Sequence, residues 1–158
     1  MPLTTDQRLS VSVAFMRCEE MFTLWERHKN ELPKKYPKIA EGKATNDIIF
    51  QPPMAYFILG NALLFPVLEY LRGEKRSDYT RDKIPLPLSI QPIEEELYEP
   101  LREFRNCVFH VQDVALSPRQ YAFLSTPDAY LKVGQVKAAV GALLVEIGKQ
   151  EKNSLQHL

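Results

Sequence analysis

Cysteine and glycine are scarce in this chain of 158 residues. The two cysteines, Cys18 and Cys107, both lie in apolar segments, which excludes a disulfide framework and a cysteine-rich zinc site. The six glycines form no phosphate-binding loop, neither GxGxxG nor GxxxxGK followed by Ser or Thr. Nucleotide-binding folds that depend on such loops therefore lose most of their support.

Net charge and long apolar runs are also missing. Twenty Lys and Arg balance twenty Asp and Glu, so the chain does not coat nucleic acid through overall charge, although a local basic patch is still allowed. The longest apolar candidate, 54–68, is broken by Gly60, Asn61 and Pro66, short of the roughly 20 residues of a membrane helix. The N-terminus lacks the pattern of a signal peptide. We expect a cytoplasmic protein without a membrane segment.

The chain has the composition of one soluble globular domain, with 45% hydrophobic and 25% charged residues. Apolar residues spaced by three and four predict long helices over about 5–32, 52–72, 93–112 and 127–149, and a short one over 117–124. No segment has the pattern of a strand. The sequence thus predicts an all-α up-down bundle of four long helices plus a short one. The domain is expected to span 1–150, with a frayed tail over 151–158.

Proline and glycine mark the predicted helix ends and kinks. Pro33 is expected to end the first helix and Gly73 the second. Pro66 is expected to kink the second helix, because it removes a backbone donor and crowds the carbonyl of Ala62. Pro100 either kinks the third helix or opens a further one; we favour a single kinked helix.

Two long connections carry positive charge. The first, 33–51, is predicted to be a loop; 27–43 contains six Lys or Arg against two Glu, a local charge of +4. It is interpreted either as a solvated loop or as a phosphate-attracting rim. The second, 73–92, is expected to be extended, and its length favours a role or a partner contact.

One stretch, 97–112, combines a regular core face with polar residues suited to chemistry. Its apolar positions are spaced four, three, four and three, and lie on one side of a helix: Leu97, Leu101, Phe104, Val108 and Val111.

The other side of this helix carries Arg102, Arg105, Asn106, Phe109 and His110. Asn106 and His110 lie one turn apart, whereas Arg105 and His110 are separated by about 140° on an ideal helix. Both side chains could converge on a group held above Asn106, the helix could loosen near His110, or a twofold dimer could bring two such faces together. A large aromatic such as Phe109 on this face suggests cover by a second subunit.

The hexapeptide Arg105-Asn106-Cys107-Val108-Phe109-His110 resembles the R-x4–6-H signature of HEPN domains, with a polar residue directly after the arginine. The resemblance implies a helical bundle that dimerises and holds the motif at the cleft between subunits. Many such proteins are metal-independent endoribonucleases of toxin–antitoxin or other defence systems. Others lack catalysis and bind RNA or nucleotides, or act as partners of nucleotidyltransferases.

RNA cleavage by its own 2′-OH needs the residue types of this motif. His110 can act as base or acid near neutral pH, and Arg105 can hold phosphate oxygens with paired donors. Asn106 can orient His110 or donate to phosphate, and Arg102 and Phe109 are candidate substrate contacts. Neither a metal nor a cofactor is expected. In a homodimer, two copies of His110 could divide the acid and base roles.

Each of these residues also has a structural interpretation. His110 could favour the dipole at a helix C-terminus, and Asn106 could be a surface amide. Arg105 could pair with an acidic residue, for example Glu99 or a residue on another helix. His28 is expected in the core or at its edge, and Cys107 in packing. The predicted function is a metal-independent endoribonuclease; the alternative is a non-catalytic module that binds RNA, a nucleotide or a protein such as an antitoxin.

Overall fold

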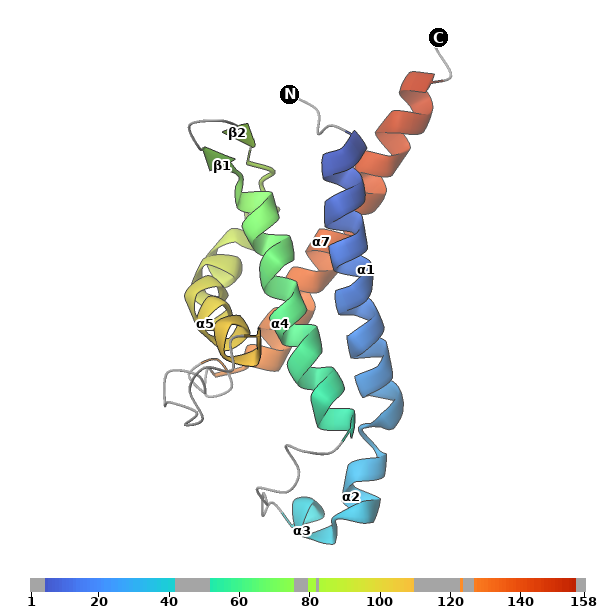
Figure 1. The fold of residues 1–158 in the computed structure, drawn as a ribbon, viewed down its shortest axis with the longest axis vertical. Coiled ribbons are helices and arrows are strands. Elements are labelled where there is room, and N and C mark those ends of the chain that lie inside the picture. The colour runs from blue at the N-terminus through green and yellow to red at the C-terminus, as the bar shows by residue number, and fades with distance from the viewer. Residues whose placement is uncertain are drawn as a thin grey trace.

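The computed structural model describes residues 5–41, 52–75, 80–81, 83–109, 123 and 127–155. Its four long helices are α1 (Thr5–His28), α4 (Pro52–Arg72), α5 (Gln91–Phe109) and α7 (Ala129–Leu155). Successive long helices run in opposite directions, as the ribbon in Figure 1 shows. The predicted all-α bundle of four long helices is therefore confirmed.

The core of the bundle centres on α4, which packs against α1 on one side and α5 on the other. At Gly60 the helices α1 and α4 approach closely, because a Cβ there would lie 3.2 Å from the Phe22 ring. The Cys18 thiol donates a hydrogen bond to the Gly60 carbonyl at the same crossing, with 3.3 Å between the atoms. A residue without a side chain at position 60 thus sets the distance between the two helices.

By length and composition, residues Pro53–Arg72 of α4 could cross a membrane, which the interrupted apolar run did not lead us to expect. Of the apolar stretch within these residues, 44% is buried inside the bundle. Six of its side chains belong to the core: Ala62, Leu64, Phe65, Val67, Leu68 and Leu71. Burial of this kind is typical of the central helix of a soluble bundle.

Helix α4 continues through Pro66 as one helix. Its one buried amide, Asn61, is 1% exposed and donates from Nδ2 to the Phe57 carbonyl at 2.8 Å. The helix ends at Gly73, whose φ of 74° lies in the left-handed region that glycine adopts freely. The predicted stop at this glycine is confirmed.

The first helix ends earlier than predicted. Helix α1 stops at His28, and two short helices follow, α2 (Glu31–Lys35) and α3 (Pro37–Ala40), inside the segment predicted to be a loop. Pro33 does not end α1, but lies in the first turn of α2. A backbone N–H at that position of a helix has no partner within the helix, so proline is tolerated there. The remainder of the predicted loop, 42–51, lies outside the described residues.

The second connection contains a short hairpin, contrary to the prediction of no strands. Strand β1 (Glu74–Lys75) pairs with the antiparallel strand β2 (Thr80–Arg81). Residues 83–87 have no regular secondary structure, and the Ile84 N–H donates to the Leu71 carbonyl at 2.8 Å. Leu86 is buried, so this segment lies on the bundle.

Helix α5 contains Pro100 within one continuous helix, so the proline does not open a further helix. Its predicted end at Gln112 lies outside the described residues. So does the short helix predicted over 117–124, except for Phe123. That side chain is 1% exposed, and its ring centroid lies 5.2 Å from that of Phe104 on α5.

Helix α7 is longer than predicted. It begins directly after Asp128, a non-glycine residue with a φ of 56°, and its first backbone bond runs from the Lys132 N–H to the Asp128 carbonyl. It ends at Leu155, beyond the predicted end at about Lys149, so the helix extends into the residues expected to form the tail.

Candidate functional site

The motif helix α5 is oriented by its apolar face. Leu97 and Leu101 are fully buried, Phe104 is 6% exposed, and Val108 packs against the core at its edge. The predicted core face is confirmed over these four positions, while Val111 lies outside the described residues. With this face fixed in the bundle, the opposite face of α5 is turned to solvent.

Acidic side chains fill the first half of α5, and each of four has a basic partner. Arg72 on α4 donates to Glu94 (Nε to Oε1, 2.7 Å) and to Glu95 (Nη2 to Oε2, 2.7 Å). Lys132 on α7 pairs with Glu96. The fourth pair, between Arg102 and Glu99, joins residues one turn apart on α5 at 2.8 Å. These pairs offset the negative charge before the motif begins.

Arg105 lies half-buried beside Asn106 and Phe109. Its Nη1 donates to Oδ1 of Asn106 at 2.9 Å, and its Cζ lies 6.0 Å from the centre of the Phe109 ring. Its Nε is buried and has no hydrogen-bond partner among the described residues. The guanidinium is thus held at the helix surface, next to an exposed amide and an aromatic ring that is 44% exposed.

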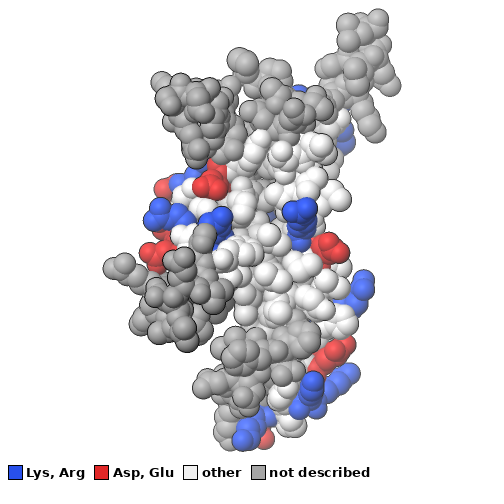
Figure 2. Space-filling model, in the orientation of Figure 1, with Lys and Arg blue, Asp and Glu red and all other residues white. Residues whose placement is uncertain are grey.

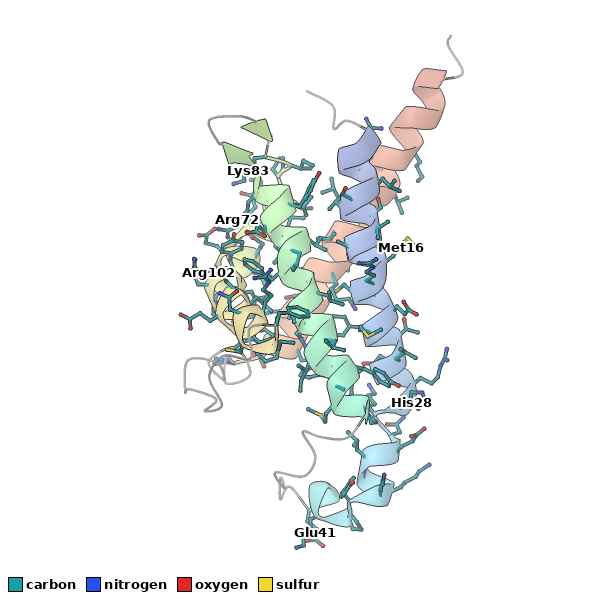
Figure 3. All side chains as sticks on the ribbon, viewed as in Figure 1. Met16, His28, Glu41, Arg72, Lys83 and Arg102 are labelled. Carbon is teal, nitrogen blue, oxygen red and sulfur yellow. The ribbon has the colours of Figure 1, made fainter. Side chains whose placement is uncertain are left out.

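Arg102, one turn before Arg105, is more exposed and differently engaged. Its side chain is 51% exposed, and its guanidinium pairs with Glu99 on the same helix. Glu99 therefore binds Arg102. The pairing of Glu99 with Arg105 that the structural interpretation considered is not found among the described residues. Arg102 and Arg72 project on the α5 side of the bundle, in the view of Figure 3.

The arrangement brings four of the five predicted site residues onto one helix: Arg102, Arg105, Asn106 and Phe109. The fifth, His110, follows directly after the last described residue of α5 and lies outside the described residues. An arginine fixed at a surface beside an amide donor can bind an oxyanion such as a phosphodiester.

The remaining histidine and cysteine predictions can be compared with the described residues. The His28 side chain is 33% exposed; its Nδ1 is 2.8 Å from Glu31 Oε1, and its ring centroid is 6.0 Å from that of Tyr56. Cys107 is half-buried, and its thiol donates to the Glu103 carbonyl at 3.1 Å. Within the described ranges, no group of three or more His, Cys, Asp or Glu could hold a metal ion.

A second polar cluster, centred on Arg72, escaped the sequence analysis. The Arg72 Cζ lies 3.4 Å from the centre of the Tyr98 ring, and Glu94 is only 8% exposed. Burial raises the pKa of the Tyr98 hydroxyl, while the neighbouring Arg72 acts to lower it. Beside this cluster is a cavity of about 60 Å³, lined also by Lys83 and Gln91. The sequence did not reveal this cluster, because acidic residues in the first turn of a helix are explained by the helix dipole alone. Nothing in the sequence indicates that Glu94 pairs with Arg72, 22 positions earlier.

This cluster connects α4, α5 and the segment 83–87. Arg72 is paired with both Glu94 and Glu95, and Gln91 Nε2 donates to the Leu86 carbonyl at 2.7 Å. The motif face of α5 therefore is the better candidate for binding and chemistry. Comparison of the chain with protein-family models, with curated proteins and with solved structures finds no match.

Proposed function

We propose that this protein is a metal-independent endoribonuclease of the HEPN type, with Arg105 and His110 as catalytic residues. The observation that supports it best is the pairing of Arg105 with Asn106 on the solvent-facing side of a rigidly packed helix. Two side chains with N–H donors stand there together, at the position where a phosphodiester could be bound. Phe109, exposed beside them, is suited to contact substrate or a second subunit.

The reaction uses the nucleophile that RNA itself carries. A base removes the proton of the 2′-OH, and the 2′-oxygen forms a bond to the adjacent phosphorus. The bond from phosphorus to the 5′-oxygen breaks, and an acid donates a proton to that oxygen, leaving a 2′,3′-cyclic phosphate. Arg105 stabilises the added negative charge on the phosphoryl oxygens, an effect of about 3–4 kcal/mol for a well-placed donor. His110 supplies the base or the acid.

A homodimer would supply both proton-transfer roles at once. Two copies of His110, one from each subunit, can act as base and acid in the same turnover. The exposed ring of Phe109 would be covered in such an interface. We place the protein in the cytoplasm, where a cognate antitoxin or a nucleotidyltransferase partner would control it.

The test is cleavage of a labelled single-stranded RNA in the presence of EDTA. We expect the wild-type protein to leave cyclic phosphate ends, and a DNA of the same sequence to stay intact. Arg105→Ala and His110→Ala should each lower the rate at least a hundredfold, since each removes one group from the transition state.

Arg17→Ala is the control, because it removes an exposed basic side chain of α1 away from α5. It should leave the rate unchanged. Undiminished cleavage by His110→Ala, in a protein with a normal melting curve, would exclude the proposal.

The second candidate is a binding module of the same architecture without turnover. Its support is the acidity of α5, where five glutamates accompany two arginines over 94–105, together with the zero net charge of the chain. In this case RNA binds with an affinity that depends on Arg105 and falls with salt, while no product forms. A filter-binding titration alongside the cleavage assay separates the two candidates.

A further inference from the structure

The end of the bundle where α1 passes into α2 combines positive charges with aromatic rings. It is remote in sequence from the motif on α5, and none of its residues is used in the proposed cleavage. The exposed basic side chains there are Arg27 in the last turn of α1, Lys34 and Lys35 in α2, and Lys38 in α3. Figure 2 shows Lys and Arg side chains at this lower end of the molecule.

The charge at this end is positive although the whole chain is neutral. Residues 26–41 contain five Lys or Arg and three Glu, a net charge of +2. Carboxylates at this end are engaged locally. Glu26 binds Lys29 and the Tyr130 hydroxyl, and these hydrogen bonds lower its pKa, that from Lys29 most strongly. Glu31 binds His28. The basic side chains therefore dominate the field that a ligand meets.

Aromatic rings continue this surface across three helices. Trp25 of α1, Phe57 of α4 and Tyr130 of α7 form a chain of ring contacts, with centroids 5.1 Å and 6.2 Å apart. Beside them, the His28 ring contacts that of Tyr56. Tyr130 is 51% exposed, so its side chain is accessible to a partner. Its hydroxyl is held by Glu26, which fixes the ring next to the end of α1.

Local contacts order the first of the basic helices, α2. Leu32 of α2 is 7% exposed and belongs to the buried hydrophobic residues. The Tyr36 N–H closes α2 by donating to the Leu32 carbonyl at 2.8 Å. The salt bridge between His28 and Glu31 joins the last turn of α1 to the first of α2. The lysines thus project from an ordered support, which lowers the entropy cost of binding.

We propose that this surface, defined by Arg27, Lys34, Lys38, Tyr56 and Tyr130, binds single-stranded RNA separately from the cleavage residues. Proteins that hold single strands combine cations that follow the phosphates with aromatic rings on which bases stack, and the α1–α2 end offers both. The choice of RNA rests on the proposed function. In that setting the surface retains the substrate, while Arg105 and His110 act on the scissile phosphate.

The experiment measures binding by fluorescence anisotropy with a labelled, unstructured RNA whose 2′-O-methyl groups prevent cleavage. Lys34→Glu combined with Lys38→Glu should raise the Kd about tenfold and lower the slope of log Kd against log salt by about 1.4, because each phosphate contact on a single strand contributes about 0.7. Tyr130→Ala should also raise the Kd about tenfold, but with an unchanged slope, because stacking releases no counterions.

Lys83→Glu combined with Lys149→Glu is the matched control, since both lysines are exposed but lie elsewhere on the bundle. It makes the same change in net charge and should leave the slope nearly unchanged. Unchanged binding by the Lys34 and Lys38 double variant, or an equal loss in the control, would overturn the inference. Binding to vesicles of anionic lipid at the same salt, with no binding to RNA, would overturn it as well.

Failure of this inference is distinguishable from failure of the proposed function. A dinucleotide substrate has a single phosphodiester, which the cleavage residues occupy, so its cleavage should be lost in Arg105→Ala and kept in the Lys34 and Lys38 double variant. Cleavage without lysine-dependent binding would exclude the RNA-binding surface and leave the proposed nuclease function intact. Lysine-dependent binding by a protein that never cleaves RNA would support the RNA-binding surface and exclude the proposed nuclease function.

Discussion

Arg105 donates a hydrogen bond from its Nη1 to Oδ1 of Asn106, the next residue along α5, with 2.9 Å between the two atoms. Neighbouring side chains on a helix leave its axis about 100° apart, so this bond requires both to lean toward each other. The amide oxygen is thereby occupied, and the amide N–H groups of Asn106 are turned away from Arg105. The two residues present donors side by side, which suits an anionic ligand.

We expect Asn106→Ala to lower RNA cleavage about tenfold, since Arg105 loses the partner that orients it. Asn106→Asp should lower cleavage further, because a carboxylate at this position pairs with the guanidinium and repels phosphate. Asn106 is exposed, so neither change should shift the melting temperature appreciably. Single-turnover rates and thermal melts of both variants check this expectation.

Arg17→Ala is a suitable control for these rates, because Arg17 is exposed on α1, away from the motif. An Asn106→Asp variant that cleaves as fast as the wild-type protein would show that Asn106 does not set the position of Arg105.

The buried pair of Arg72 and Glu94 should be a main support of the α4–α5 contact. Their side chains are 26% and 11% exposed and share two hydrogen bonds, of 2.7 and 3.1 Å. Glu94→Gln leaves a guanidinium in a half-buried position with a weaker partner, so it should lower the free energy of unfolding by about 2–3 kcal/mol.

Glu95→Gln is the matched comparison for this pair. Glu95 binds the same guanidinium but is 76% exposed, so its loss should cost less than about 1 kcal/mol. Urea denaturation of the three proteins gives both values. Equal effects of the two substitutions would mean that burial of Glu94 does not matter.

Much of the fold could be predicted because its long helices carry regular apolar faces. The residues Leu97, Leu101 and Phe104 are buried as their spacing indicates. Gly73 ends α4 as predicted, because a left-handed backbone position favours glycine. Local patterns of this kind are legible in the sequence, since each depends on a few neighbouring residues.

Features that depend on contacts between distant residues were missed. Arg72 and Glu94 are separated by 22 positions, and nothing in either segment marks them as partners. Pro33 was interpreted as the end of a helix, although a proline in a first helical turn is equally compatible with a helix that follows it. For the candidate site, the sequence places Arg105, Asn106 and Phe109 on one face, but the bond between Arg105 and Asn106 required coordinates.

Substitution by alanine should change the stability of the protein in opposite directions at Gly60 and Gly134. At Gly60 a Cβ would meet the Phe22 ring at 3.2 Å, so Gly60→Ala should force α1 and α4 apart and destabilise the fold by about 1–3 kcal/mol. At Gly134 a Cβ would meet nothing within 4 Å, so Gly134→Ala should stabilise α7 by about 0.5–1 kcal/mol. Denaturant titrations of both variants test this contrast. A stabilised Gly60→Ala protein would contradict the close crossing of the two helices.

Cys18 should make the stability of the protein depend on pH in the alkaline range. Burial raises the pKa of this thiol from its ordinary value of 9.0 to about 12. The unfolded chain therefore loses the proton as the pH rises above 9, while the folded protein keeps it. The stabilisation is complete below pH 9 and is lost progressively toward pH 12, by up to about 1.4 kcal/mol for each pH unit.

Cys18→Ala separates this effect from the tyrosines and lysines that titrate in the same range. The variant should be less stable at neutral pH, because it leaves a cavity beside Gly60, but its free energy of unfolding should fall less steeply with pH. Cys107→Ala, which removes the half-buried thiol, should keep the slope of the wild-type protein. Urea denaturation between about pH 8 and pH 10.5 measures the three slopes. Parallel curves for wild type and Cys18→Ala would mean that the thiol of Cys18 ionises as easily in the folded protein as in the unfolded chain.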